Sequence, residues 1–197
     1  MGRALALLLL LGLSRAWAQT VSCDATDLLF DFSASGPLQT LTVGGQSYYV
    51  ANLASYLLLL SGTSPMRFLP TQAAGAGTNR WATCALTTPR GGGGGGVLCG
   101  AGTTRCFRVS NVSDSLPVDW TGRLYVLVQV ASGSATSHVP TPTLLSAVPD
   151  NRGLASVDRN TTAVLRIYYW LELSPTDLFP SFPATGTLTL TYSLQRN

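Results

Sequence analysis

The feature that most constrains the fold of this chain is a strict alternation of apolar and hydroxyl side chains over residues 187–194. A period of two places all the apolar residues on one face of a β-strand. Leu188, Leu190, Tyr192 and Leu194 are therefore predicted to face a core, and the threonines and the serine between them to face water. The pattern is typical of a strand in a half-buried β-sheet.

Other segments also have strand signals, whereas helix signals are scarce. The other predicted strands are residues 27–32, 38–43, 46–50, 124–130 and 162–173. Residues 38–43 and 46–50 are expected to form a hairpin with its turn at Gly44-Gly45. In the strand of residues 124–130, one face is predicted to contain Leu124, Val126, Val128 and Val130. Residues 54–60 are a buried strand or a short helix, because periodicity cannot separate the two at that length. Strands at this spacing with proline-rich links predict an all-β fold. The expected architecture is an antiparallel β-sandwich of the immunoglobulin or fibronectin kind, or two small β modules.

Residues 1–18 have the pattern of a secretory signal peptide. A basic head at Arg3 is followed by an apolar run over residues 4–13, and Ala16-Trp17-Ala18 fits the small-x-small pattern of a cleavage site. The run is shorter than the roughly 20 residues that span a bilayer. Cleavage is expected after Ala18, with a secreted or cell-surface-associated product. No later segment is apolar enough for a membrane span of the chain's own.

A glycine-rich segment is expected to divide the mature chain. Residues 91–103 are predicted to be a flexible loop between a β-rich part over residues 19–90 and a second one over residues 104–197. Residues 19–197 are alternatively one domain. A phosphate-binding loop would need a G-K-[ST] ending, which this tract does not have.

Four cysteines follow the signal peptide: Cys23, Cys84, Cys99 and Cys106. An even number in an oxidising compartment predicts two disulfides, with three possible pairings. A Cys99–Cys106 bond closing a tight loop and a Cys23–Cys84 bond holding the N-terminal strand are both plausible. Zinc binding is disfavoured because no C-x₂-C pair occurs, so no metal ligand is predicted.

Two segments fit the acceptor pattern for N-linked glycans. Asn111 is followed by Val-Ser and Asn160 by Thr-Thr, so both are predicted to be glycosylated and exposed. The mature chain is nearly neutral, with ten arginines against nine acidic residues once residues 1–18 are set aside. Nucleic acids and anionic membranes attract clustered positive charge, so neither is predicted as a partner.

Few residues offer side-chain chemistry, and neither a catalytic residue nor a cofactor is predicted. The one histidine, His138, has no nucleophile motif of the G-x-S-x-G type to serve, and Glu172 and Asp177 are the nearest candidate pair of carboxylates. A group of aspartates near the mature N-terminus has no calcium-loop pattern: Asp24, Asp27 and Asp31. An extracellular hydrolase with a site assembled in space remains an alternative, as does a lipid or small-ligand carrier.

Aromatic residues in two places are either core or binding residues. Tyr168, Tyr169 and Trp170 are consecutive in a predicted strand and are either core residues or a ligand platform. Trp120 is either a core residue or an exposed anchor for a partner. The sequence leaves both alternatives open.

One segment resembles a known family. An aromatic-x-Val-Ser-Asn start at Phe107 is followed by Gly122-Arg123-Leu124-Tyr125, a strand, a small-residue turn over residues 133–137 and a Pro-Thr stretch ending at Asp150. Residues 107–150 resemble the membrane-proximal ectodomain of the uroplakin II/III type, glycoproteins of the urothelial surface. The resemblance implies pairing with a membrane glycoprotein or tetraspanin and assembly at a cell surface. Where that family has a transmembrane helix, this chain has a glycosylation triplet and two further strands.

These observations together predict a secreted or cell-surface-associated glycoprotein that binds another protein outside the cell, or assembles with it, rather than an enzyme. The expected mechanism is association through a sheet face or edge. Aromatic anchors would supply binding energy, and glycans would limit which faces can meet.

Overall fold

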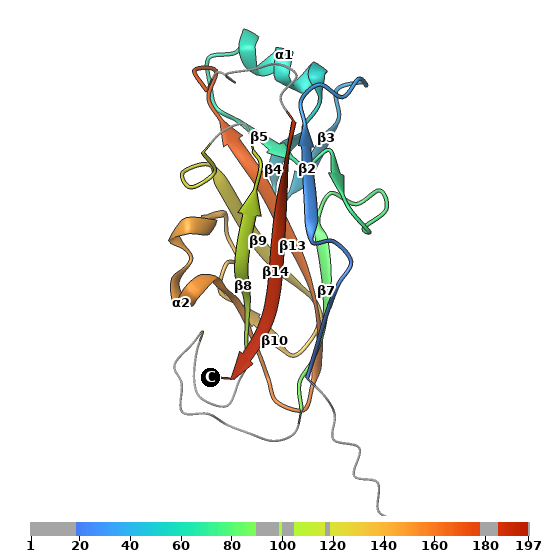
Figure 1. Ribbon diagram of the computed structural model, residues 1–197, viewed down its shortest axis with the longest axis vertical. Coiled ribbons are helices and arrows are strands. Elements are labelled where there is room, and N and C mark those ends of the chain that lie inside the picture. The colour runs from blue at the N-terminus through green and yellow to red at the C-terminus, as the bar shows by residue number, and fades with distance from the viewer. Residues whose placement is uncertain (1–18, 90–98, 100–104, 117–118, 178–184, 197) are drawn as a thin grey trace, which may run out of the picture.

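Two stacked β-sheets form the body of the molecule (Figure 1). The computed structural model describes residues 19–89, 99, 105–116, 119–177 and 185–196. The predicted signal peptide, and the glycine-rich loop apart from Cys99, lie outside these residues. Apolar residues of the two sheets pack in one core cluster, so the prediction of an all-β, antiparallel-rich sandwich is confirmed.

The first sheet, here called sheet A, is built around its longest strand. Its strands are β1 (Thr20–Cys23), β3 (Thr40–Val43), β4 (Gln46–Val50), β5 (Met66–Leu69), β7 (Ala82–Thr87), β9 (Leu124–Gly133), β11 (Thr143–Leu144) and β13 (Thr162–Leu173). One edge of β13 pairs with β7 and, further along, with β5, while the other edge pairs with β9. All pairs are antiparallel except β4 with β5.

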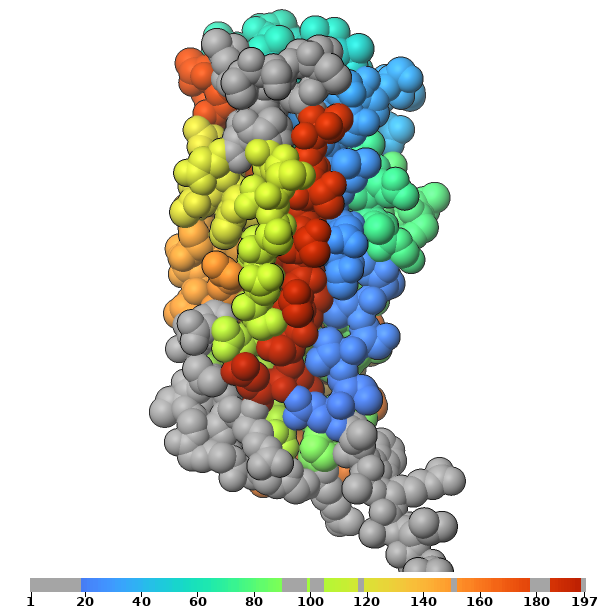
Figure 2. All heavy atoms as spheres, viewed as in Figure 1, coloured from blue at the N-terminus to red at the C-terminus, as the bar shows by residue number. Residues whose placement is uncertain are grey.

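The second sheet, sheet B, is entirely antiparallel. Its strands, in spatial order, are β10 (Ala135–Ser137), β12 (Gly153–Val157), β8 (Arg105–Asp114), β14 (Thr185–Arg196), β2 (Asp27–Asp31) and β6 (Gln72–Ala73). Figure 2 shows β8, β14 and β2 side by side on one face of the molecule. Strands from both sides of the glycine-rich segment therefore share each sheet.

The apolar run that the sequence left open between strand and helix is a helix, α1 (Leu53–Ser61). Asn52 caps it: its side-chain oxygen accepts the Ser55 N–H at 2.8 Å, and the Ser55 hydroxyl accepts the Asn52 N–H at 3.1 Å. The run has no β-branched residue, which favours the helix over a strand. Two shorter helical segments, η1 (Leu145–Ala147) and α2 (Pro149–Arg152), precede β12.

The strand patterns account for most of the core. Leu188, Leu190 and Leu194 of β14 are buried, and Tyr192 packs against them partly buried, as predicted. Of the four residues predicted to share one face of β9, Leu124, Val126 and Val128 are buried, whereas Val130 is 38% exposed. It pairs with Leu165 at an irregularity in the β9–β13 register, where the strict alternation ends.

The hairpin prediction is also confirmed. β3 and β4 pair directly across Gly44 and Gly45, whose φ angles of 56° and 77° are those of a type I′ turn. None of the helices in the described part of the chain is long and apolar enough to cross a membrane.

Candidate functional site

The two predicted glycan acceptors are exposed and lie far apart in the fold. Asn111 belongs to β8 in sheet B, next to a bulge at which no residue of β14 lies opposite Ser110 in the strand register. Asn160 lies in the turn between β12 and β13 with φ of 53°, a left-handed conformation that asparagine tolerates better than most residues. Both positions meet the exposure that glycosylation requires, and glycosylation itself stays a prediction.

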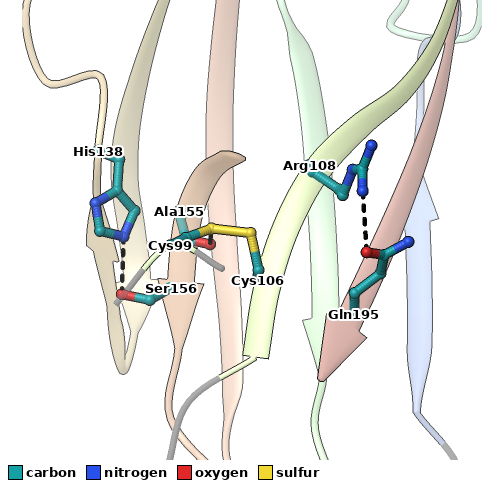
Figure 3. The surroundings of a disulfide bond; sticks show 7 residues. All are labelled: Cys99, Cys106, Arg108, His138, Ala155, Ser156 and Gln195. Carbon is teal, nitrogen blue, oxygen red and sulfur yellow. Dashed lines mark hydrogen bonds between the residues drawn. A yellow bond between two sulfur atoms is a disulfide. The ribbon is translucent and has the colours of Figure 1, made fainter. Parts of the chain in front are cut away.

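Both expected disulfides are present. Cys23–Cys84 joins the directly paired strands β1 and β7, and Cys99–Cys106 fastens Cys99 to β8. Figure 3 shows the second bond beside Ala155, whose carbonyl oxygen is 3.6 Å from the Cys99 sulfur. Cys99 and Cys106 are both buried.

The histidine considered for catalysis lies at the edge of sheet B. His138 is exposed, and its Nε2 lies 3.1 Å from the hydroxyl of the buried Ser156 (Figure 3). A catalytic Ser-His pair also needs a group that orients the other ring nitrogen. Among the described residues, His138 donates no hydrogen bond to a carboxylate.

The two carboxylates considered as a catalytic pair are in separate ion pairs. Glu172 accepts a hydrogen bond from Arg67 at 3.1 Å, and Asp177 accepts one from Arg123 at 2.6 Å. The hydrogen bond from Arg123 lowers the pKa of Asp177, and the same contact raises the pKa of the guanidinium. These contacts join loops and strands at the end of sheet A and give each carboxylate a structural partner.

The three aspartates between residues 24 and 31 each accept hydrogen bonds from a different residue. Asp24 accepts the Thr83 N–H at 2.6 Å, and Asp27 accepts the Thr189 hydroxyl at 2.7 Å. Asp31 binds the backbone and hydroxyl of the nearby Ser33. Within the described residues, no group of three or more His, Cys, Asp or Glu side chains gathers as a metal site would require.

The outer face of sheet A has a cluster of aromatic side chains that is separate from the main core. It contains Tyr48, Trp81, Tyr125, Tyr168 and Trp170, here called the aromatic face. Trp170 is fully buried between Tyr125, stacked at 5.7 Å between ring centroids, and Tyr48, edge-on at 5.0 Å. Trp81 and Tyr168 lie 5.3 Å apart. Trp81 and Tyr125 are partly exposed.

Burial raises the pKa of both Tyr48 and Tyr168, so both phenols are neutral at physiological pH. The hydroxyl of Tyr48 and the indole N–H of Trp170 are buried without a hydrogen-bond partner in the described part of the chain. Tyr169, which the sequence grouped with its neighbours, points into the main core instead. Alternation along β13 separates it from Tyr168 and Trp170.

A second feature, on sheet B, was not predicted from the sequence. A cavity of about 360 Å³, here called the arginine pocket, is lined by Arg108, Ser110, Ser146, Val148 and Arg152. Two of these residues lie on β8, and the other three lie in the segment that runs through η1 and α2. The two arginines are far apart in sequence, so no local motif joins them.

Trp120, considered as an exposed anchor, packs partly buried against the core. Its ring lies 5.8 Å from the guanidinium carbon of Arg152.

Comparisons of the chain with protein-family models, with curated proteins and with solved structures find no match. What the fold and these surfaces define is a disulfide-linked, two-sheet β-sandwich.

Proposed function

We propose that this chain is a secreted or cell-surface-associated glycoprotein that binds another protein through the aromatic face of sheet A. The observation that carries the proposal is the aromatic cluster on the outer side of a sheet whose inner side already supplies the core. The outward residues of a two-sheet sandwich are usually polar. Tyr and Trp are the residues that most often supply binding energy at protein interfaces.

The cluster is organised for binding before any partner arrives. Trp170 holds Tyr125 and Tyr48 by ring contacts, so these side chains have little freedom left to lose on association. Trp81 and Tyr125 keep part of their surface open to a partner. The unpartnered donors of Tyr48 and Trp170 each cost stability, on the order of 1–3 kcal/mol, which favours a function for the cluster beyond folding.

The charges around the aromatic face and the positions of the glycan acceptors also support binding through this face. The Arg67–Glu172 ion pair lies close enough to Tyr48 to affect its pKa, and so gives the aromatic face a polar border. Asn111 is on the other sheet, and Asn160 lies in a turn at the far end of β13 from Trp170. Glycans at these positions would leave the aromatic face accessible.

Two disulfides support an oxidising environment, as secreted proteins have. The resemblance of residues 107–150 to uroplakin ectodomains supports association with a membrane protein and assembly at a cell surface. In this proposal the chain reaches the membrane through its partner.

Secretion and glycosylation are tested by mass spectrometry of the protein released from cultured mammalian cells. We expect an N-terminus at Gln19, because Ala18 completes the cleavage pattern. Removal of N-glycans should convert Asn111 and Asn160 to aspartate, which marks each occupied site. Retention of Met1 with both asparagines unmodified would contradict this half of the proposal.

Binding is tested with the secreted protein, biotinylated and assembled into tetramers on fluorescent streptavidin, applied to a panel of cell lines. We expect saturable, protease-sensitive staining. Trp81→Ala should weaken it about tenfold or more, as for an interface hot spot. Ala85→Asn creates a new glycan acceptor on the outer side of sheet A, because Ala85 is exposed and Thr87 lies two residues on. It should abolish staining by steric exclusion.

Thr189→Asn provides the matched control, since Thr191 completes the same acceptor pattern on exposed positions of β14 in sheet B. This variant should stain as the unmodified protein does. Equal staining by Ala85→Asn and Thr189→Asn, or no saturable staining of any line, would contradict binding through the aromatic face.

A further inference from the structure

We propose that the arginine pocket on sheet B is a binding site for a small oxyanion group: a carboxylate, a sulfate or a phosphate. This inference is independent of the aromatic face, which lies on the other sheet. It rests on the charge of the pocket, on an unused donor of Arg108 and on the backbone conformation of Arg152.

Among the described residues that line the pocket, two are positively charged arginines and none is a carboxylate. Neither Arg108 nor Arg152 has an ion-pair partner within 4.0 Å among the described residues, whereas Arg67 and Arg123 each have one. Two guanidinium groups lining one cavity repel each other, and an anion between them would remove that repulsion. Guanidinium groups also match the geometry of carboxylate, sulfate and phosphate oxygens.

The Arg108 guanidinium has an N–H donor that is not used by any described residue. One terminal N–H₂ group donates to the Gln195 side-chain oxygen at 3.0 Å (Figure 3). Its Nε is buried and has no acceptor in the described part of the chain. Because Arg108 lines the cavity, an oxygen atom of a bound oxyanion would accept the hydrogen bond from this Nε–H group.

Arg152 has a left-handed backbone and an aromatic neighbour. Its φ of 62° is left-handed, which costs a residue with a side chain roughly 1–2 kcal/mol and costs glycine almost nothing. Its guanidinium lies over the Trp120 ring. An arginine kept at a strained position at a pocket wall indicates a role for the side chain.

The Cys99–Cys106 disulfide packs beside the pocket. A Cβ on Gly153 would lie 2.7 Å from the Cys99 sulfur, so the backbone next to Arg152 packs directly on the Cys99–Cys106 bond. Cys106 is two residues before Arg108 on β8, and Gly153 pairs with Arg108 across the sheet. The bond therefore lies against the backbone next to both arginines: Cys106 is on β8 with Arg108, and the Cys99 sulfur packs on Gly153, which follows Arg152.

The lining also limits the kind of ligand. The hydroxyls of Ser110 and Ser146 donate to the backbone carbonyls of Thr191 and Thr121, so the arginines supply the N–H donors for the anion. A volume of about 360 Å³ is near the lower end for small-molecule sites, which suits a single charged group or one acidic sugar.

The test is an NMR titration of the ¹⁵N-labelled secreted protein, treated to remove N-glycans because Asn111 adjoins the pocket. The probes are sodium sulfate, phosphate and acetate, each compared with sodium chloride at equal ionic strength. We expect saturable shifts of the Arg108 Nε–H signal. Arg152→Gly should weaken binding at least tenfold, and its left-handed backbone accommodates glycine without strain, so this variant is expected to fold.

Arg159→Ala is the matched control, because it removes one positive charge at an exposed turn outside the pocket. It should bind each anion as the unmodified protein does. Equal weakening by Arg152→Gly and Arg159→Ala would reduce the effect to net charge and overturn the proposal. The proposal would also be overturned if none of the three anions shifted the Arg108 Nε–H signal more than sodium chloride does. Preference for acetate would identify a carboxylate as the natural group, and preference for sulfate or phosphate a tetrahedral ester.

Discussion

Replacing Cys23 and Cys84 together by alanine is expected to lower the free energy of unfolding by about 4 kcal/mol. This disulfide closes a loop with a sequence separation of 61 residues, so removing it returns much conformational freedom to the unfolded chain. Cys84 is fully buried and packs in the main core, so the lost sulfur also leaves a gap there.

The other disulfide provides an internal comparison. Cys99 and Cys106 are separated by only 7 residues, and the same relation gives about 2.5 kcal/mol for their replacement by alanine. Urea unfolding of both double variants, followed by tryptophan fluorescence, measures the difference. Loop entropy would be the wrong explanation if the Cys99/Cys106 variant lost as much stability as the Cys23/Cys84 variant, or more.

The Cys99/Cys106 variant should differ in a second way. Because that disulfide packs on Gly153 next to the arginine pocket, its loss should weaken anion binding while most of the stability remains. Loss of the Cys23–Cys84 bond, which lies in sheet A, should leave anion affinity unchanged under conditions where the protein is folded.

Gly75→Ala is expected to destabilise the protein by roughly 3 kcal/mol or more, through overpacking added to backbone strain. Gly75 follows β6 with φ of 87°, and a Cβ there would lie 2.0 Å from the Asp24 carbonyl oxygen. The contact is between two backbones, so no side-chain rotation can relieve it. The loop after β6 must then move away from the link between β1 and β2.

Gly77→Ala separates the two causes. Gly77 also has a positive φ, 62°, but nothing lies within 4 Å of its would-be Cβ. This variant should therefore lose only the strain of a left-handed alanine, about 1–2 kcal/mol. Thermal unfolding of both variants gives the comparison. Similar losses for the two would show that the close approach at Gly75 relaxes at little cost.

The strands that were predicted, β2, β3, β4, β9, β13 and β14, each have a local pattern, whereas the other strands were not predicted. Strict alternation identified the inward residues of β14, and the β-branched and aromatic run of β13 was predicted with the same first and last residues as in the structure, Thr162 and Leu173. Gly44-Gly45 identified the hairpin. The segment of α1 was left open between strand and helix, because a run of seven mostly apolar residues fits both periods. The capping contact between Asn52 and Ser55 favours the helix.

The two surface sites, which are formed by residues distant in the sequence, left weaker patterns in the sequence than the strands did. The aromatic face could have been inferred in part, since alternation assigns Tyr168 and Trp170 to the side of β13 that the core does not use. Its other members come from strands and loops that only the folded sheet brings together. The arginine pocket had no such clue, because Arg108 and Arg152 meet only when Gly153 pairs beside β8.

The place of β14 in the middle of sheet B has a consequence for biosynthesis. β14 lies between β8 and β2, so β2, made early, gains its main partner only after about 150 further residues have been synthesised. Until residues 185–196 have been synthesised, the edges of β2 and β8 that pair with β14 stay open to wrong pairing. Completion of sheet B should therefore wait for the synthesis of residues 185–196, and chaperones that cover open strand edges should assist the chain until then.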